Sequence, residues 1–266
     1  MPILEADKLR KSFNGRVVVQ DVSLRVEEAE TVGLLGRNGA GKTTSFRMTI
    51  GMIEPDAGKV FFQGEEVTGL PMYRHARRGM GYLSQEPSAF QRMTCEQNLL
   101  AILETVPGMS RKQRKKRAGE LLEQFGLTKK TRELARTCSG GERRKLEIAR
   151  ALVTNPKLVL LDEPFSGVDP IAVEDLQREV KRLNTDFGIA ILITDHNVQQ
   201  TLSVCVRAYI VNEGRILAEG TPQQLINNDM VRRVYLGSLF RGDEFDKSGS
   251  AGAGRPNRAV SEGVAS

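Results

Sequence analysis

The sequence predicts an α/β fold built on a mostly parallel sheet, and three observations support this prediction. A glycine-rich segment, 36–43, follows an apolar run at 31–35 and precedes a helical pattern. Two other apolar runs, 158–161 and 189–193, are short and unbroken, which is typical of strands buried on both faces of a parallel sheet. Both runs end in polar residues, at the strand ends where open α/β sheets bind ligands.

The N-terminal part predicts a second, smaller sheet. Residues 1–30 alternate apolar and polar side chains, and Asn14-Gly15 is a hairpin-turn signal between two such runs. Residues 60–62 add another short strand before Gly64. We therefore expect a small antiparallel β subdomain beside the parallel core.

The middle of the chain predicts an inserted helical subdomain, over about residues 89–139. Helical patterns occupy 96–103 and 121–125, and the basic run 111–117 lies between them. Gly126 is expected to end the second of these helices.

Helices and strands alternate again from residue 140 to 240, so we expect one domain, 1–240, with the helical subdomain inserted in it. Residues 241–266 are rich in Gly, Ser and Ala and hold few large apolar side chains. Such a segment cannot bury enough apolar surface to fold, and it is predicted to be a disordered tail.

Composition limits the classes of protein to consider. The 266 residues include 39 Lys and Arg against 33 Asp and Glu, a net charge of +6. No stretch approaches the roughly 18 apolar residues that a membrane helix needs. The N-terminus carries Glu5 and Asp7 and no apolar core, so no signal peptide is expected. Any membrane part of a larger assembly is therefore expected to come from other subunits.

The basic run 111–117 and the cysteines carry weaker signals. The run is interpreted as a solvated helix face; contact with anionic lipid headgroups is the alternative. Nucleic acid is a third and weaker interpretation, because no aromatic residue interleaves the run. Cys95, Cys138 and Cys205 are odd in number and widely spaced, so neither a disulfide framework nor a metal motif is expected. A reducing cytosol fits this usage.

The segment GRNGAGKT at 36–43 has the full P-loop pattern, placed between a predicted strand and a predicted helix. Glycines let backbone N–H groups point at one anion, and the helix N-terminus adds its positive dipole end. Lys42 adds a charge worth about 4 kcal/mol against one negative charge at about 4 Å. The residues expected to contact the nucleotide here are Gly36, Asn38, Gly39, Ala40, Gly41, Lys42, Thr43 and Thr44.

Polar residues after the other strands predict a catalytic centre for phosphate chemistry. Asp162 is expected to hold Mg²⁺ opposite the hydroxyl of Thr43, and Glu163 to orient and deprotonate the attacking water. His196 follows the run 189–193 and is expected to reach the γ-phosphate. Gln85, after another short strand, is expected to touch both Mg²⁺ and the water. The other histidine, His75, is interpreted as structural.

Ser139-Gly140-Gly141-Glu142 predicts a second phosphate-binding element. Ser139 and Glu142 have the spacing of a capping box before an amphipathic helix. A cap does not need Gly140 and Gly141, each of which costs roughly 1 kcal/mol relative to Ala in a helix. A close approach of backbone to an anion does need them. Because one folded chain cannot easily place this element and the P-loop on one nucleotide, the pair predicts two copies closing on ATP.

These motifs together resemble the ATP-binding cassette (ABC) ATPases over residues 1–240. The resemblance rests on the P-loop, Gln85, Ser139 to Glu142, Asp162-Glu163, Val168-Asp169-Pro170 and His196. It implies a head-to-tail homodimer with ATP between the P-loop of one copy and residues 139–142 of the other. It also implies that Asp169 communicates across the dimer and that Phe13 stacks on adenine, where the family more often has Tyr.

Finer resemblance points to the lipopolysaccharide-export ATPases, through segments such as 84–90, 193–198 and 234–237. It implies an enzyme on the cytoplasmic face of the inner membrane that powers two transmembrane subunits, which dock near Gln85 and Phe90. Branched-chain amino-acid importer ATPases are the alternative, and a soluble ABC ATPase acting on DNA or ribosomes is a weaker one. Cys138, where the family usually has Leu, and a tail without an expected counterpart are departures.

Overall fold

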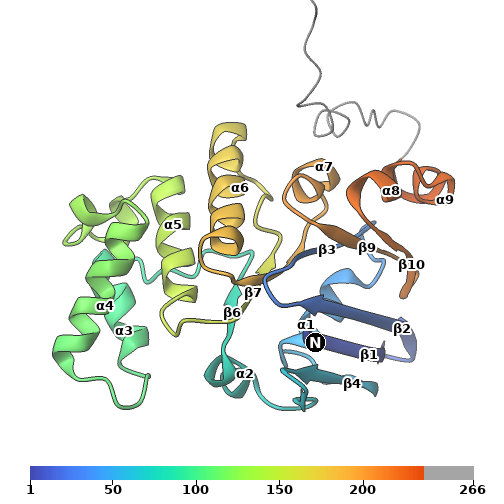
Figure 1. Cartoon of the computed structure of the whole chain (residues 1–266), viewed down its shortest axis with the longest axis horizontal. Coiled ribbons are helices and arrows are strands. Elements are labelled where there is room, and N and C mark those ends of the chain that lie inside the picture. Colours follow the sequence, from blue (N-terminus) through green and yellow to red (C-terminus); the bar gives the residue numbers. More distant parts are fainter. Residues whose placement is uncertain (237–266) are drawn as a thin grey trace, which may run out of the picture.

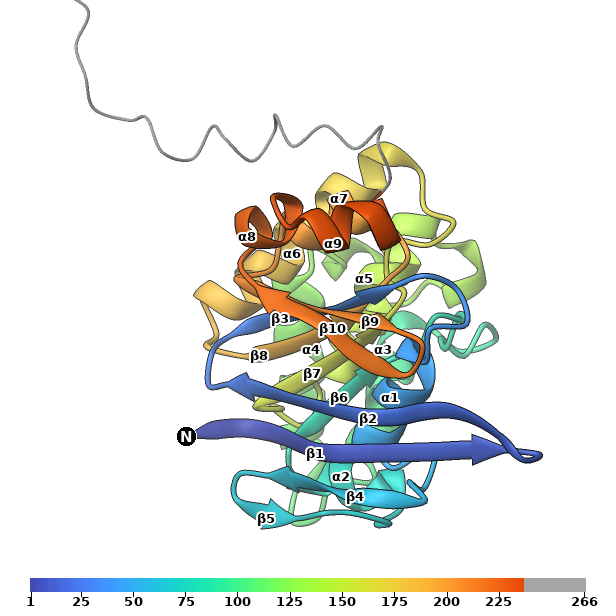
Figure 2. The same cartoon turned by 90° about the vertical axis from the view of Figure 1, so that its right-hand side faces the viewer.

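The computed structural model describes residues 1–236, and the predicted disordered tail at 241–266 lies outside them. Within residues 1–236 the strands form one ten-stranded sheet in the order β5-β4-β1-β2-β10-β9-β3-β8-β7-β6 (Figure 1, Figure 2). The strands are β1 (Pro2–Phe13), β2 (Arg16–Glu27), β3 (Thr31–Gly36), β4 (Ala57–Phe62), β5 (Glu65–Glu66), β6 (Met80–Leu83), β7 (Leu158–Asp162), β8 (Ala190–Thr194), β9 (Arg207–Asn212) and β10 (Arg215–Gly220).

The parallel half of the sheet forms the centre of the molecule. β3 pairs in parallel with β8 and β9, and β7 pairs in parallel with β6 and β8. Every residue of β3, β7 and β8 is buried, because helices or other strands cover both faces. The predicted strands at 158–161 and 189–193 are thus confirmed, and their carboxyl ends meet at one edge.

The predicted antiparallel sheet is confirmed, although it continues the parallel sheet instead of standing apart from it. β1 and β2 form a hairpin in which Asn14 and Gly15 have φ of 49° and 80°. β4 pairs with the other edge of β1, and β10 bridges β2 to the parallel half.

One region departs from the predicted alternation of helices and strands. β9 and β10 form an antiparallel hairpin, with no helix between them, across Glu213 and Gly214. Both turn residues have positive φ, 48° and 74°, as a two-residue turn requires. The residue pair Glu-Gly is a weaker turn signal than Asn-Gly.

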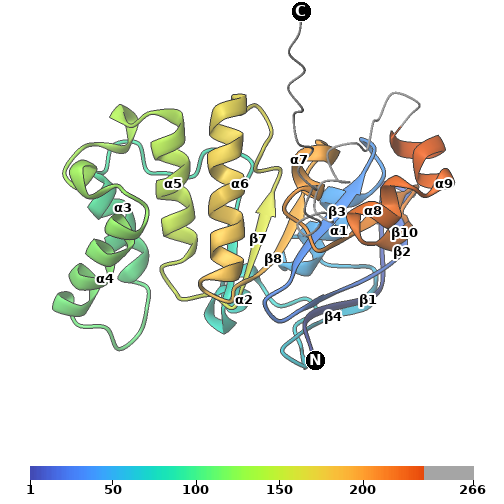
Figure 3. The same ribbon diagram turned by 45° about the horizontal axis from the view of Figure 1, so that its top comes forward.

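The helices divide into a group at one end of the molecule and others around the sheet (Figure 1, Figure 3). α3, α4, α5 and α6 share one continuous apolar core with one face of β7 and β8. The opposite face packs on the antiparallel sheet and α1. The helices are α1 (Lys42–Thr49), α2 (Met72–Arg78), α3 (Cys95–Leu103), α4 (Arg111–Gln124), α5 (Gly140–Ala151), α6 (Pro170–Thr185), α7 (Val198–Leu202), α8 (Pro222–Ile226) and α9 (Asp229–Val231).

Local capping explains why the inserted helices begin where they do. Thr94 and Gln97 form a capping box at α3, and Ser110 and Gln113 form one at α4. Gly126, with a φ of 67°, lies just beyond α4, as predicted. No helix within residues 1–236 is both long and apolar enough to cross a membrane.

Short helical turns complete the described chain. 3₁₀ turns lie between α4 and α5, and a π-helical turn follows α9. Their bounds are Thr128–Lys130 and Ala135–Thr137 for the 3₁₀ turns, and Arg232–Leu236 for the π-helical turn.

Candidate functional site

The glycine-rich segment forms a tight loop between β3 and α1. Gly36 ends β3 with a φ of 152°, and a Cβ there would lie 2.2 Å from the backbone oxygen of Val211. Gly41 has a φ of 100° at the start of α1, where no side chain of the described residues caps the helix. The first N–H groups of α1 are therefore open to an anion. Lys42 Nζ folds back and donates to the backbone oxygen of Arg37 (3.0 Å).

The loop borders an open cavity of about 660 Å³, which it shares with residues far away in the sequence. His196 and Tyr235 line this cavity beside residues 36–40. The Tyr235 hydroxyl is buried near the backbone of Gly36, and burial raises the pKa of Tyr235 to about 12. Thr43 and Thr44 lie half-buried in the first turn of α1.

Asp162, at the end of β7, is buried, and one of its two carboxylate oxygens has no hydrogen-bond partner within residues 1–236. Its Oδ2 lies 3.7 Å from Arg47 Nη2 and accepts a hydrogen bond from the Tyr82 hydroxyl (3.3 Å). Its Oδ1 is buried and has no hydrogen-bond partner within residues 1–236. Burial raises the pKa of Asp162 above its ordinary value, and the charge of Arg47 opposes this only in part. The free oxygen fits a cation ligand.

The structure brings Gln85, Glu163 and His196 together around one carboxylate. Gln85 Nε2 donates to Glu163 Oε2 (2.8 Å), and His196 Nδ1 lies 3.6 Å from the same oxygen. Glu163 has a φ of 44°, a left-handed backbone that a non-glycine residue seldom adopts. Burial lowers the pKa of Lys42, and the charges of Glu163 and Asp195 oppose this shift only in part.

Three residues beside these were assigned no role by the sequence patterns. Asp195 is fully buried and accepts from the N–H groups of Phe165 (3.0 Å) and Asn197 (2.9 Å), which fixes the loops after β7 and β8. Its place directly after a buried strand was the available signal. Arg47 and Tyr82, which hold Asp162, lie on α1 and β6 and carry no motif.

Residues 139–142 form the N-terminus of α5. Ser139 Oγ accepts from the Glu142 N–H (3.2 Å), and Glu142 Oε2 accepts from the Ser139 N–H (2.8 Å). The predicted capping box is thus present. Gly140 and Gly141 are exposed, and a Cβ on either would meet no atom of the described residues within 4 Å.

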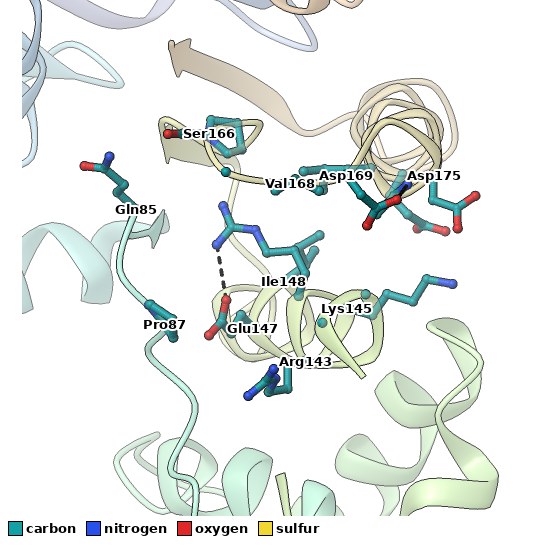
Figure 4. Close-up of a pocket in the computed structure, with 18 of the residues that line it drawn as sticks. Gln85, Pro87, Arg143, Lys145, Glu147, Ile148, Ser166, Val168, Asp169 and Asp175 are labelled. Atoms are coloured by element: carbon teal, nitrogen blue, oxygen red, sulfur yellow. Dashed lines mark hydrogen bonds and ion pairs between the residues drawn. The ribbon is translucent and has the colours of Figure 1, made fainter. Parts of the chain in front are cut away.

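These glycines line a second cavity, of about 330 Å³, between α5 and α6 (Figure 4). Gln85, Glu163 and Asp169 line the same cavity, whereas no residue of the P-loop does. Asp169 caps α6 by accepting from the Ala172 N–H (3.0 Å).

Phe13 lies apart, at the β1–β2 hairpin. It is 43% exposed, and Lys11 Nζ lies 5.7 Å from its ring centre. His75, by contrast, is buried, and its ring contacts the backbone oxygen of Leu70 (3.1 Å) and Met80 Sδ (3.4 Å). It serves the packing of α2.

Comparison with known proteins identifies the family. Residues 19–166, more than half of the chain, match the family model described as ABC transporter. This chain belongs to the ABC transporter ATPase family. As a member of this family it is an ATPase, and the predicted P-loop α/β fold is confirmed.

Two curated relatives of this ABC ATPase are similar over their entire length. One is the lipopolysaccharide export system ATP-binding protein LptB of Haemophilus influenzae, 52% identical over 91% of this chain and 100% of the relative. LptB of Escherichia coli is 50% identical with the same coverage. Among solved structures, the ADP conformation of MJ1267, an ATP-binding cassette of an ABC transporter, superposes with a TM-score of 0.80 at 29% identity. That match covers 89% of this chain and 99% of MJ1267.

Proposed function

We propose that this ABC ATPase powers the export of lipopolysaccharide from the inner membrane, acting from the cytoplasmic face through separate transmembrane subunits. The observation that carries the proposal is the 52% and 50% identity, over the full length of both relatives, to lipopolysaccharide export ATP-binding proteins. Branched-chain amino-acid import and a soluble role on DNA or ribosomes are outcomes that the test below distinguishes.

The P-loop is the proposed cradle for the ATP phosphates. Open N–H groups at the start of α1 and the buried charge of Lys42 support this role. The proposed contacts comprise Gly36, Asn38, Gly39, Ala40, Gly41, Lys42, Thr43 and Thr44. The exposed ring of Phe13 is the proposed stacking face for adenine.

Mg²⁺ is the proposed cofactor, and the unpartnered Oδ1 of Asp162 supports it. No group of three or more His, Cys, Asp or Glu within residues 1–236 is arranged to hold a metal. Mg²⁺ commonly needs only one or two carboxylates when substrate phosphates supply further oxygens. Asp162, the Thr43 hydroxyl and the Gln85 amide would hold the ion, which would neutralise part of the triphosphate charge.

Glu163 is the proposed general base for the attacking water. Gln85 orients its carboxylate through a 2.8 Å hydrogen bond. His196 Nδ1 lies 3.6 Å from the same oxygen and 3.4 Å from Asp195 Oδ1. His196 also borders the P-loop cavity and is the proposed contact to the γ-phosphate. In this arrangement the water oxygen attacks the γ-phosphorus while its proton passes to Glu163. The bond from that phosphorus to the β–γ bridging oxygen breaks, and ADP leaves with the bonding electrons, so the products are ADP and inorganic phosphate.

The second half of the phosphate grip is proposed to come from another copy of the chain. The element formed by Ser139, Gly140, Gly141 and Glu142 is a helix N-terminus at the surface. Gly140 and Gly141 line a cavity that no P-loop residue lines. A head-to-tail homodimer would set this element on the ATP held by the partner's P-loop. Asp169, in the same cavity, is the proposed contact across the dimer.

Phe90 marks the proposed docking surface for the transmembrane subunits, next to Gln85. Its ring is 45% exposed and lies under the Arg150 guanidinium, 4.6 Å from ring centre to Cζ. A stacked, exposed aromatic side chain is typical of a protein-binding anchor.

Isolation of the protein from membranes tests which substrate its transmembrane partners carry. The tagged full chain, carrying Glu163→Gln to prolong the ATP-bound state, is extracted in detergent from its own host and its companions are identified by mass. We expect transmembrane subunits together with bound lipopolysaccharide. Recovery of branched-chain amino-acid permeases, or of nucleic acid without membrane polypeptides, would contradict the proposal.

A matched pair of variants tests the docking surface. Phe187 is also 45% exposed and lies 5.8 Å from the Arg182 guanidinium, but it follows α6. Phe90→Ala is expected to lose the transmembrane companions and Phe187→Ala to retain them. Equal recovery of the transmembrane subunits with both variants would contradict a docking surface at Phe90.

A further inference from the structure

The loop that carries Gln85 is tied at both ends to α5. Near its start, Arg144 Nη1 donates to the backbone oxygen of Ser84 (3.2 Å). At its end, Glu147 Oε1 accepts from the N–H groups of Ser88 (2.8 Å) and Ala89 (3.3 Å). Gln85 thus lies between two anchor points on one helix.

Glu147 is the centre of this attachment. It is 5% exposed, and glutamate is seldom buried to this degree without a specific partner. Its second oxygen, Oε2, is paired with Arg144 Nη1 at 3.1 Å, the contact marked by the dashed line in Figure 4. Both carboxylate oxygens are therefore engaged, one by the loop and one by the arginine that holds the loop's other end.

Arg150 adds a third attachment one turn further along α5. It donates to the backbone oxygen of Ser88, and also to Ser88 Oγ at 3.1 Å. The end of the loop is thus held by an anion on its N–H groups and a cation on its carbonyl.

Gln85 itself is exposed, and the contact recorded for its side chain is the 2.8 Å hydrogen bond to Glu163. The position of its amide is consequently set by the anchored ends of the loop. The same helix begins at Ser139 to Glu142, and Glu147 lies only about 7.5 Å further along its axis, at 1.5 Å per residue. The helix N-terminus and the loop anchors therefore belong to one helix, α5.

We propose that Glu147 is a positioning residue for hydrolysis: with Arg144 it fixes the loop 84–89 to α5 and so holds Gln85 against Glu163. This inference rests on the proposed role of Glu163 as the general base. It assigns to α5 a second task beyond presenting Ser139 and the two glycines. A displacement of α5 would then be transmitted to the base through side chains of the same chain.

Substitution of Glu147 in the full chain tests the proposal. Glu147→Gln keeps an oxygen for the two loop N–H groups and removes the charge that Arg144 needs. We expect kcat for ATP hydrolysis to fall about tenfold, the low end for groups that orient a reacting residue. KM for ATP is expected to stay within about twofold, because the P-loop is untouched. Glu120→Gln is the matched control and should retain wild-type kcat, because Glu120 lies on α4, outside the cavity between α5 and α6, and is paired with Lys116 at 3.8 Å.

A double variant distinguishes positioning from general damage. If Glu147 acts through Gln85, adding Glu147→Gln to Gln85→Ala should produce no further loss, because residues that act as a unit are non-additive. Multiplied losses in the double variant would overturn the proposal, and so would a Gln85→Ala variant with wild-type kcat. Wild-type kcat in Glu147→Gln would overturn it as well.

The failure of this inference is distinguishable from failure of the proposed function. Glu163→Gln is measured in parallel. Near wild-type turnover in that variant would show that Glu163 is not the general base. If Glu163→Gln is slow and Glu147→Gln is not, only the positioning role is lost. Thermal unfolding of Glu147→Gln confirms that the compared proteins are folded at the assay temperature.

Discussion

The glycines of the P-loop and those at the start of α5 differ in what their own chain demands of them. A Cβ at Gly36 would lie 2.2 Å from one backbone oxygen, and one at Gly41 would lie 2.8 Å from another. Both have positive φ. Gly140 and Gly141 have neither constraint: within residues 1–236 nothing lies within 4 Å of a Cβ built on them.

The difference separates glycines that the fold requires from glycines that it does not require. The fold requires glycine at positions 36 and 41, since an alanine Cβ would collide with backbone there, whereas a Cβ at Gly39 would meet no atom of the described residues within 4 Å. The fold gains nothing from glycine at the start of α5, where alanine would favour the helix by up to about 1 kcal/mol. Gly140 and Gly141 thus leave room for another molecule to approach the helix N-terminus closely, and the proposed head-to-tail dimer would use that room.

The largest expected effect comes from blocking the exposed element at Ser139. Ser139→Phe is expected to abolish ATP-dependent dimerisation and to lower turnover by at least roughly 10²-fold, because a partner's phosphate could no longer approach the helix N-terminus. The measurement is the mass by light scattering with Mg²⁺ and ATP, in a Glu163→Gln background. Thr154→Phe, exposed near the other end of α5, is the control. A mass that still doubles with ATP in Ser139→Phe would contradict a role of the α5 N-terminus in dimerisation.

A pair of alanine substitutions gives the sharpest test of the comparison. Gly36→Ala should lower the free energy of unfolding by about 2–4 kcal/mol, since strain and overpacking combine there. Gly140→Ala should raise it by up to about 1 kcal/mol. Thermal unfolding without nucleotide measures both, as a fall of at least about 4 °C and a rise of up to about 4 °C. Equal destabilisation would mean that the protomer needs both glycines.

Sequence patterns predicted the elements whose signal is local. The P-loop, the buried strands β7 and β8, the Asn14-Gly15 hairpin and the capping box at Ser139 each need only a few neighbouring residues. The β9–β10 hairpin was missed because its Glu-Gly turn gives a weak signal. The continuity of the two sheets was missed because it depends on one long-range bridge, Arg215 to Asp21.

The groups that hold the predicted site residues could not be read from sequence. Arg47 and Tyr82 meet Asp162 only because α1, β6 and β7 are neighbours in the fold. Glu147 has the sequence context of an ordinary helix glutamate, and only burial against the loop 84–89 distinguishes it. Sequence motifs identify the residues that are expected to contact a ligand. The residues that hold those side chains in place are determined by packing in the folded chain and have no motif of their own.

The smallest expected effect concerns Asp162, the buried carboxylate of the core. Its folded pKa is raised, chiefly by burial, so its ionised form costs stability at pH values above that pKa. Asp162→Asn should therefore unfold at a higher temperature than the wild type at pH 8, by about 2–4 °C for about 1 kcal/mol. Arg47, whose side chain is 40% exposed, can turn to water when the charge is removed.

The advantage of Asp162→Asn should shrink as pH falls through the folded pKa of Asp162, because the wild-type carboxylate then takes up a proton. Asp56 is the opposite case, since the hydrogen bond from Lys11 lowers its pKa, and Asp56→Asn should not stabilise the protein at pH 8. With Mg²⁺ and ATP the wild type should melt at a higher temperature than Asp162→Asn, because the ligands stabilise the wild type more. An Asp162→Asn protein that melts below the wild type at pH 8 without ligand would show that the fold, and not the cation, needs this carboxylate.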